Sequence, residues 1–204
     1  MKKIVLASLL LSFNFLTFCQ NKNPSATTTP AKDSLPKYAK DKVLPNFKIV
    51  VDVRLKDASR KLLDTTLFTN ANLPANRPVV IVYFSPECGH CHFEMKEIIK
   101  NIDSLRNAFF VFTSRYPIDS IKGFANKYKV SSYPNMVMGK DPTYFFPVYY
   151  NISFTPFIAV YDTNKNFVKA YPEGANMHEL ISLVNTPPAE NVIEKKSKKK
   201  HTAN

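Results

Sequence analysis

The segment 79–84 limits the possible folds more than any other part of this chain. It reads Val-Val-Ile-Val-Tyr-Phe, an uninterrupted run of strand-forming apolar side chains. Such a run predicts a strand that is covered on both faces of its sheet, because a half-exposed strand would alternate apolar and polar residues. A helix on one of those faces is predicted by the apolar residues that follow at three- and four-residue steps. They are Cys91, Met95, Ile98, Ile99, Ile102 and Leu105.

The rest of the central region continues this alternation of strands and helices. Further strands are predicted at 47–55, 109–113, 157–161 and 167–171, the last two forming a hairpin around a polar turn. Further helices are predicted at 121–128 and 177–184. The order is strand, helix, strand, helix, and then a hairpin and a last helix. It predicts an α/β layer fold with a mixed sheet flanked by helices.

The first 19 residues have the composition of an export signal. A basic start precedes the mostly apolar segment 4–18, which is too short and too interrupted for a comfortable membrane span. Residues 16–19 resemble a bacterial lipobox, in which Cys19 would carry lipid, although Phe18 stands where that pattern has a small residue. Ordinary cleavage before Gln20 is the alternative. Both routes predict a periplasmic or cell-envelope protein, soluble or tethered to a membrane at one end.

Composition and charge separate a folded region from two polar segments. We interpret 20–43 as a flexible linker, 44–185 as one domain and 186–204 as a disordered basic tail. The chain has 28 Lys and Arg against 16 Asp and Glu, a formal charge of +12, but residues 44–185 hold 16 basic and 12 acidic residues and contribute only +4. Nucleic acid is therefore not an expected partner, because that function would place a basic stripe on the folded part.

We expect the reactive site at Cys88-Gly89-His90-Cys91, between the predicted strand 79–84 and the predicted helix that follows it. Unpaired amides and the dipole at a helix start stabilise a thiolate, which is the attacking form of cysteine. Cysteines three apart lie on one helical face, close enough for a disulfide. A protonated His90 would favour the Cys88 thiolate further and make the pair more oxidising. The alternatives are half of a zinc site, which lacks well-spaced further ligands, and a purely structural disulfide.

Residues 84–94 around this motif resemble the active-site stretch of thioredoxin-fold proteins, and most of all the exported TlpA/ResA-like thiol–disulfide oxidoreductases. Leu44-Pro45-Asn46-Phe47 resembles the opening of that group, and 150–156 resembles its segment ending in a cis-proline. The resemblance covers 44–185 and implies a thioredoxin-like fold with an extra strand and helix. We place these at 136–138 and 141–150. For the aromatic residues of 144–150, core packing is the plainer interpretation and contact with a substrate the weaker one.

The resemblance also assigns roles to individual residues. Cys88 would attack, Cys91 would resolve, and Pro156 would be the cis-proline that holds the substrate backbone. Glu94 would affect thiol titration by moving a proton or by raising a thiol pKa, unless it is only a solvated charge. The surrounding active-site loop would comprise Glu87, Gly89, His90 and Thr155. No metal and no cofactor beyond the Cys88–Cys91 disulfide are implied.

The partners implied are protein thiol or disulfide substrates and an electron donor or acceptor in the envelope. Three departures from the family pattern stand at Glu87, Val82 and Lys96, in place of a tryptophan, a buried acid and a helix-kinking proline. They argue against a general reductase role but not against dithiol chemistry. The sequence leaves open whether the protein reduces, oxidises or isomerises disulfides.

Two other functions are compatible with the same fold. A Cu(I)-binding protein would use Cys88 and Cys91 with His90 or His92, and Met136 or Met138 as a further soft ligand. A thiol peroxidase of the peroxiredoxin type would need a threonine where Ser85 stands, and serine is an imperfect substitute.

Overall fold

The centre of the molecule is one mixed sheet. In the computed structural model, which describes residues 41–51 and 67–187, seven strands pair in the order β2-β1-β5-β4-β3-β6-β7. They are β1 (Lys48–Val50), β2 (Leu67–Thr69), β3 (Val79–Tyr83), β4 (Phe109–Ser114), β5 (Met136–Lys140), β6 (Phe157–Tyr161) and β7 (Phe167–Tyr171). The central strands β3, β4 and β5 are parallel. Strands β1 and β6 pair antiparallel with β5 and β3, and the edge strands β2 and β7 pair antiparallel with β1 and β6.

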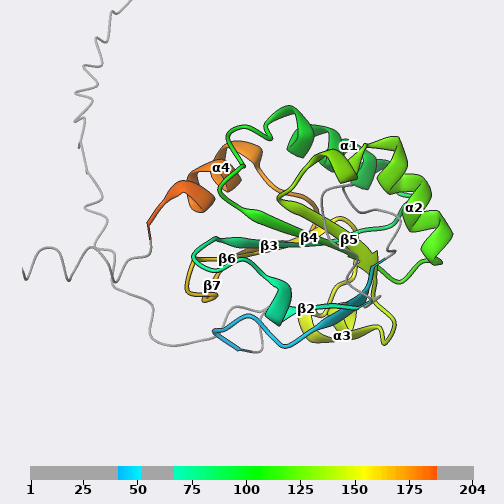
Figure 1. The fold of residues 1–204 in the computed structure, drawn as a ribbon, viewed down its shortest axis with the longest axis horizontal. Coiled ribbons are helices and arrows are strands. Elements are labelled where there is room, and N and C mark those ends of the chain that lie inside the picture. The colour runs from blue at the N-terminus through cyan, green and yellow to red at the C-terminus, as the bar shows by residue number, and fades with distance from the viewer. Residues whose placement is uncertain (1–40, 52–66, 188–204) are drawn as a thin grey trace, which may run out of the picture. The chain divides into compact units, whose positions relative to one another are not determined.

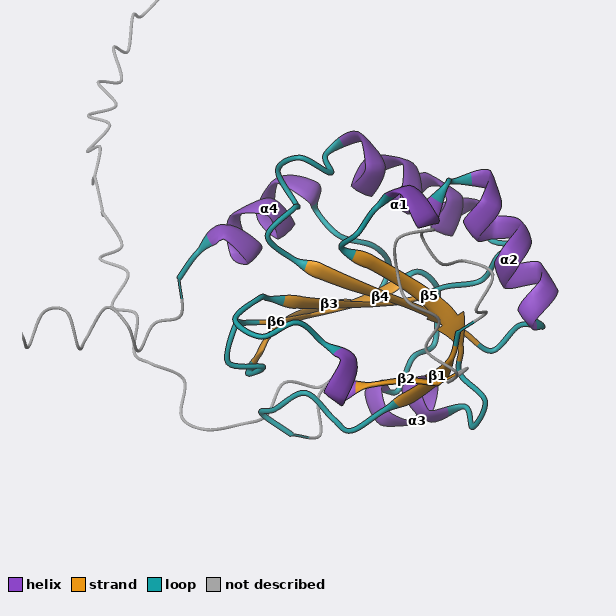
Figure 2. Cartoon of the chain, viewed as in Figure 1, coloured by secondary structure: helices purple, strands orange, loops and turns teal. Residues whose placement is uncertain are grey.

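Helices cover both faces of this sheet, as Figures 1 and 2 show. The helices are α1 (Gly89–Lys100), α2 (Ile118–Lys127), α3 (Phe145–Tyr150) and α4 (Met177–Asn185), with short 3₁₀ turns at Asn70–Asn72 and Val130–Ser132. Helices α1, α2 and α4 pack on one face, and α3 packs on the other together with the segment before β1. The predicted fold class, a mixed sheet flanked by helices, is confirmed.

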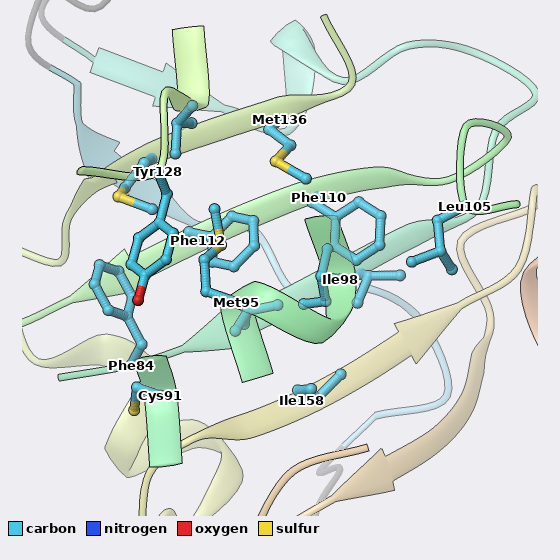
Figure 3. Close-up of a cluster of buried hydrophobic side chains, with 14 of the residues drawn as sticks. Phe84, Cys91, Met95, Ile98, Leu105, Phe110, Phe112, Tyr128, Met136 and Ile158 are labelled. Atoms are coloured by element: carbon cyan, nitrogen blue, oxygen red, sulfur yellow. The ribbon is translucent and has the colours of Figure 1, made fainter. Parts of the chain in front are cut away.

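Alternate side chains of β3 belong to two different hydrophobic cores, one on each face of the sheet. Val80 and Val82 belong to the larger core under α1, α2 and α4, whereas Val79, Ile81 and Tyr83 belong to the smaller core under α3. All five residues are at most 5% exposed, so the prediction of a strand covered on both faces is confirmed. Figure 3 shows side chains of the larger core, with Phe84, Cys91, Met95 and Ile98 among them.

Most predicted elements are present, with differences at their ends. The strand predicted at 47–55 is described only at Lys48–Val50, and residues 52–66 lie outside the described part. The helix predicted to reach Leu105 ends at Lys100, because Asn101 caps it and its side-chain amide donates to the Glu97 carbonyl at 2.9 Å. Leu105 is still buried, in the turns that follow. The short strand β2 was not predicted.

The extra strand and helix lie where they were predicted. They are β5 and α3, and the aromatic residues of 144–150 differ in burial. Phe145 and Tyr149 are half-buried against the smaller core. Phe146 and Tyr150 are fully buried in the smaller core, as the plainer interpretation expected. Tyr144 is 46% exposed, so core packing is wrong for that residue.

The predicted signal sequence with Cys19, nearly all of the predicted linker and nearly all of the predicted tail lie outside the described residues. No helix within the described ranges is long and apolar enough to cross a membrane.

Candidate active site

Cys88 stands at the point where the chain leaves β3 and enters α1. It is the N-cap residue of α1, with an extended backbone at φ −83° and ψ 122°. The turn before it is closed by the Cys88 N–H, which donates to the Ser85 carbonyl at 3.2 Å. The side chain is half-buried, and its thiol donates to the Thr155 carbonyl at 3.5 Å. The first thiol of the motif is therefore at a helix start and partly open to solvent, as predicted.

The surroundings of Cys88 favour its ionised form. Partial burial raises the pKa of the thiol, but polar contacts from the Cys91 backbone N–H, the Cys91 thiol and Thr155 outweigh it, so the pKa is lowered overall. The backbone N–H of His90 acts in the same direction. The sequence argument expected the His90 ring to do this, whereas the contribution found comes from the backbone.

Cys91 has the opposite environment one turn further along α1. Its side chain is 2% exposed, and the Ser85 N–H donates to its sulfur at 3.4 Å. Burial raises the pKa of the Cys91 thiol to about 12, although the Ser85 hydrogen bond opposes this. Both cysteines are free thiols in this form of the protein. The pair thus combines one accessible, acidic thiol with one buried, protonated thiol.

The segment before β6 closes the site. Thr155 contacts the Cys88 thiol, and the Thr155–Pro156 peptide bond is cis. Pro156 is buried at the start of β6. The structure therefore brings Thr155 and Pro156, which are more than sixty residues away in sequence, to the same place as the cysteines.

Glu94 is buried on α1 rather than solvated. It is 6% exposed, its Oε2 accepts the Ala175 N–H at 3.2 Å, and its Oε1 has no hydrogen-bond partner among the described residues. Burial raises the pKa of this carboxyl to about 7, while the Ala175 hydrogen bond opposes the rise. The alternative of a solvated helix charge is wrong. A carboxyl of this kind exchanges protons at neutral pH.

Gly174 fits tightly between Glu94 and the cis-proline. Its φ is +107°, and a Cβ placed on it would lie 2.8 Å from Glu94 Oε2 and 3.7 Å from Pro156 Cγ. A side chain at 174 would therefore collide with the carboxylate and strain the backbone. Gly174 was not predicted as a site residue from the sequence. The burial of Glu94 was not predicted either, although its spacing to Cys91 and Ile98 places it on the buried face of the helix.

A cavity of about 270 Å³ opens beside Cys88. It is lined by the end of β3, by residues just after β4, by α3 and its N-cap, and by the segment 152–155. Its lining contains Tyr83, Arg115 and Phe154, which were not predicted as site residues, and Tyr144, for which contact with a substrate was the weaker interpretation. Phe154 is 66% exposed at this cavity. The cavity gives a partner molecule direct access to the Cys88 sulfur.

The remaining predicted loop residues are exposed. Glu87, Gly89 and His90 lie at the surface around Cys88. Met136 and Met138, considered as soft metal ligands, are buried in the larger core, and His92 Nδ1 lies 2.8 Å from the Tyr128 hydroxyl. No group of three or more His, Cys, Asp or Glu in the described part of the chain is arranged to hold a metal ion.

Comparisons with known proteins agree with this architecture. Residues 60–148 match the family model described as Thioredoxin, which includes the two cysteines. A candidate thioredoxin from Neisseria meningitidis superposes with a TM-score of 0.53 at 17% identity, over 69% of this chain and 86% of that one. The described domain has the thioredoxin fold. No curated protein matches the chain by sequence.

Two other solved structures resemble this chain to a similar degree. DsbF of Mycobacterium tuberculosis, solved in mixed oxidised and reduced forms, superposes with a TM-score of 0.50 at 22% identity, over 66% of this chain and 96% of that one. ScoI of Arabidopsis thaliana with copper bound gives 0.51 at 14% identity, over 69% and 94%. These likenesses show the fold, and the reaction must be argued from the site.

Proposed function

We propose that this protein is an exported thiol–disulfide oxidoreductase that exchanges disulfides with protein substrates through Cys88 and Cys91. The observation that carries the proposal is the asymmetry of the two thiols. Cys88 is half-buried with a lowered pKa at the start of α1, and Cys91 is buried with a raised pKa one turn behind it. Attack requires an accessible thiolate, and resolution requires a second thiol held close to the first.

In the reducing direction the Cys88 thiolate attacks one sulfur of a client disulfide. A Cys88–client mixed disulfide forms, and the other client sulfur leaves as a thiolate. Cys91 then loses its proton and attacks the Cys88 sulfur, which releases the second client thiol. The client gains two electrons, the protein is left with a Cys88–Cys91 disulfide, and an envelope dithiol must restore it. The oxidising direction is the reverse of these steps.

Glu94 has the pKa of a base that could take the proton from the Cys91 thiol. A thiol with a pKa of about 12 is almost entirely protonated at neutral pH, so resolution needs a base. A buried carboxyl with a pKa of about 7 is ionised about half the time under those conditions. We assign to Glu94 the exchange of this proton, and to Thr155 and Pro156 the contact with the client backbone next to Cys88.

The mechanism is tested by trapping the mixed disulfide. Cys91→Ser should accumulate covalent complexes between Cys88 and envelope proteins, visible by non-reducing electrophoresis and lost on reduction. The matched control is the double variant Cys88→Ser, Cys91→Ser, which should trap nothing. If Cys91→Ser has a free Cys88 thiol and still forms no complex, dithiol exchange is not the function.

The direction of exchange is decided by the reduction potential of the Cys88–Cys91 pair. A lowered Cys88 pKa stabilises the reduced form and makes the pair more oxidising. A potential near about −270 mV would assign a reductase, and one above about −180 mV would assign an oxidant or isomerase.

The proposal of export depends on the composition of residues 1–19. Mass spectrometry of the mature N-terminus would distinguish lipidation of Cys19 from cleavage after it.

A further inference from the structure

The cavity beside Cys88 is lined by a cation that has no carboxylate partner among residues 41–51 and 67–187. Arg115 follows the end of β4 and is exposed at the cavity. Its guanidinium carbon lies 5.9 Å from the centre of the Tyr116 ring and 5.9 Å from the centre of the Tyr144 ring. Among the described residues, no carboxylate comes within ion-pair distance of it. The two aromatic rings hold the guanidinium in place while its N–H groups stay available.

A second lining residue of the cavity carries a buried hydroxyl. Tyr83 ends β3, is 5% exposed, and lines the cavity. Its hydroxyl is buried and has no hydrogen-bond partner in the described part of the chain, although the Arg115 backbone N–H lies nearby. A buried hydroxyl without a partner costs free energy, which a bound acceptor would recover. Arg115 thus presents a charged fork to the cavity, and Tyr83 is a further lining residue whose buried hydroxyl has no partner among the described residues.

Two carboxylates near this cavity do not neutralise Arg115. Asp141 is buried beneath α3, and its oxygens accept the N–H groups of Thr143, Phe145 and Phe146 at 3.0 to 3.3 Å. It is not part of the cavity lining. Glu87 directly precedes Cys88, is exposed, and is also absent from the lining. Among the lining residues that the structure describes, Arg115 is the only cation, and the Cys88 thiol is the only group that ionises to an anion near neutral pH.

We propose that this cavity is a subsite for an acidic side chain of the client, next to the client cysteine that Cys88 attacks. A guanidinium binds a carboxylate through two parallel hydrogen bonds, and the Tyr83 hydroxyl supplies a third donor. The volume of about 270 Å³ accommodates one side chain, and the exposed Phe154 beside it gives an apolar contact for the neighbouring residue. This inference rests on the proposed function and adds a substrate preference to it.

The test uses the Cys91→Ser protein and short peptides whose single cysteine is activated as a 2-thiopyridyl disulfide. Peptides differ only in having Glu, Gln or Lys at each of the positions flanking the cysteine. The rate of peptide attachment to Cys88 is followed by mass spectrometry. At one flanking position at least, Glu should react about tenfold faster than Gln, as expected for a charge-assisted bidentate pair, and Lys should be slowest.

Substitutions of the cavity residues Arg115 and Tyr83 then test whether the preference for Glu peptides arises in the cavity. In Arg115→Gln the ratio of Glu to Gln rates should fall to within about twofold, and in Tyr83→Phe it should fall in part. Arg115→Lys, which keeps the charge but not the fork, should retain only a fraction of the preference. The matched control is Arg106→Gln, an exposed arginine in the turns after α1, which should leave the ratio unchanged. Thermal unfolding verifies that each variant is folded.

Two outcomes would overturn the subsite while leaving the proposed function standing. One is equal attachment rates for Glu and Gln peptides at every position in the starting protein. The other is a Glu preference that persists in folded Arg115→Gln. If no peptide attaches to Cys88 at all, the proposed function itself fails, and the subsite fails with it.

Discussion

At the scale of single residues, Gly174 packs against Glu94 and Pro156 and leaves no room for a side chain. Gly174 has φ +107°, and any Cβ there would lie 2.8 Å from Glu94 Oε2. Because L residues avoid this φ and the contact is far too short, Gly174→Ala should lower the free energy of unfolding by roughly 2 kcal/mol. Urea denaturation of the reduced protein measures this change.

A second glycine provides the control for that substitution. Gly123 lies in α2, and a Cβ there would meet nothing within 4 Å. Gly123→Ala should raise the stability by about 0.5 to 1 kcal/mol, because alanine favours the helix. Equal effects of the two substitutions would contradict the tight fit assigned to Gly174.

The sequence predicted the two cysteines because their information is local. A C-x-x-C spacing after an apolar strand and before a helical pattern is enough to place both sulfurs at a helix start. Their difference in burial, and with it the opposite shifts in pKa, depends on the packing of Cys91 against β3 and Ser85. Arg115 could not be recognised from sequence, since the aromatic ring of Tyr144 reaches it from a segment almost thirty residues later.

At the scale of elements, α3 depends on one buried carboxylate. Asp141 is 2% exposed and accepts the N–H groups of Phe145 and Phe146 at 3.0 Å each. Asp141→Ala would leave these amides unsatisfied at the start of α3 and should destabilise the protein by about 2 kcal/mol, whereas Asp141→Asn should cost less. Denaturation midpoints of the two variants make the comparison. A loss in Asp141→Ala no larger than in Asp141→Asn would show that the cap is not needed.

The edge of the sheet shows what sequence patterns miss. Strand β2 has only three residues, too few for an alternating pattern to be visible, so it was not predicted. The contact between β1 and β5 depends on Gly139, where a Cβ would lie 2.7 Å from the Val50 carbonyl oxygen. A glycine in a strand can indicate such a close approach, but it does not say which backbone approaches. The central strands were predictable because burial on both faces leaves a continuous apolar run.

At the scale of the whole molecule, the buried Glu94 links stability to pH. Its pKa is about 7 in the folded protein and near 4.5 for an ordinary carboxyl. Between these values the folded state binds more protons than the unfolded state, so stability falls as pH rises from about 4.5 to about 7. The fall from this one group should be about 3 kcal/mol, since each pKa unit corresponds to about 1.4 kcal/mol.

The comparison with Glu94→Gln isolates that contribution. Glutamine keeps the shape and an acceptor for the Ala175 N–H but does not titrate. The difference in unfolding free energy between the two proteins should therefore change by about 3 kcal/mol over this range, with the starting protein relatively more stable at low pH. Parallel pH profiles for the two proteins would mean that Glu94 titrates as an ordinary carboxyl.

The proposed chemistry depends on a difference between two thiols, an accessible thiolate at Cys88 and a buried thiol at Cys91. Alkylation of the reduced full chain with iodoacetamide over a series of pH values, followed by peptide mapping, measures both directly and separates them from Cys19. We expect Cys88 to react first, with a midpoint below that of an unperturbed thiol, and Cys91 to stay unmodified near neutral pH. Equal rates at Cys88 and Cys91, or a Cys88 midpoint like that of free cysteine, would contradict the account.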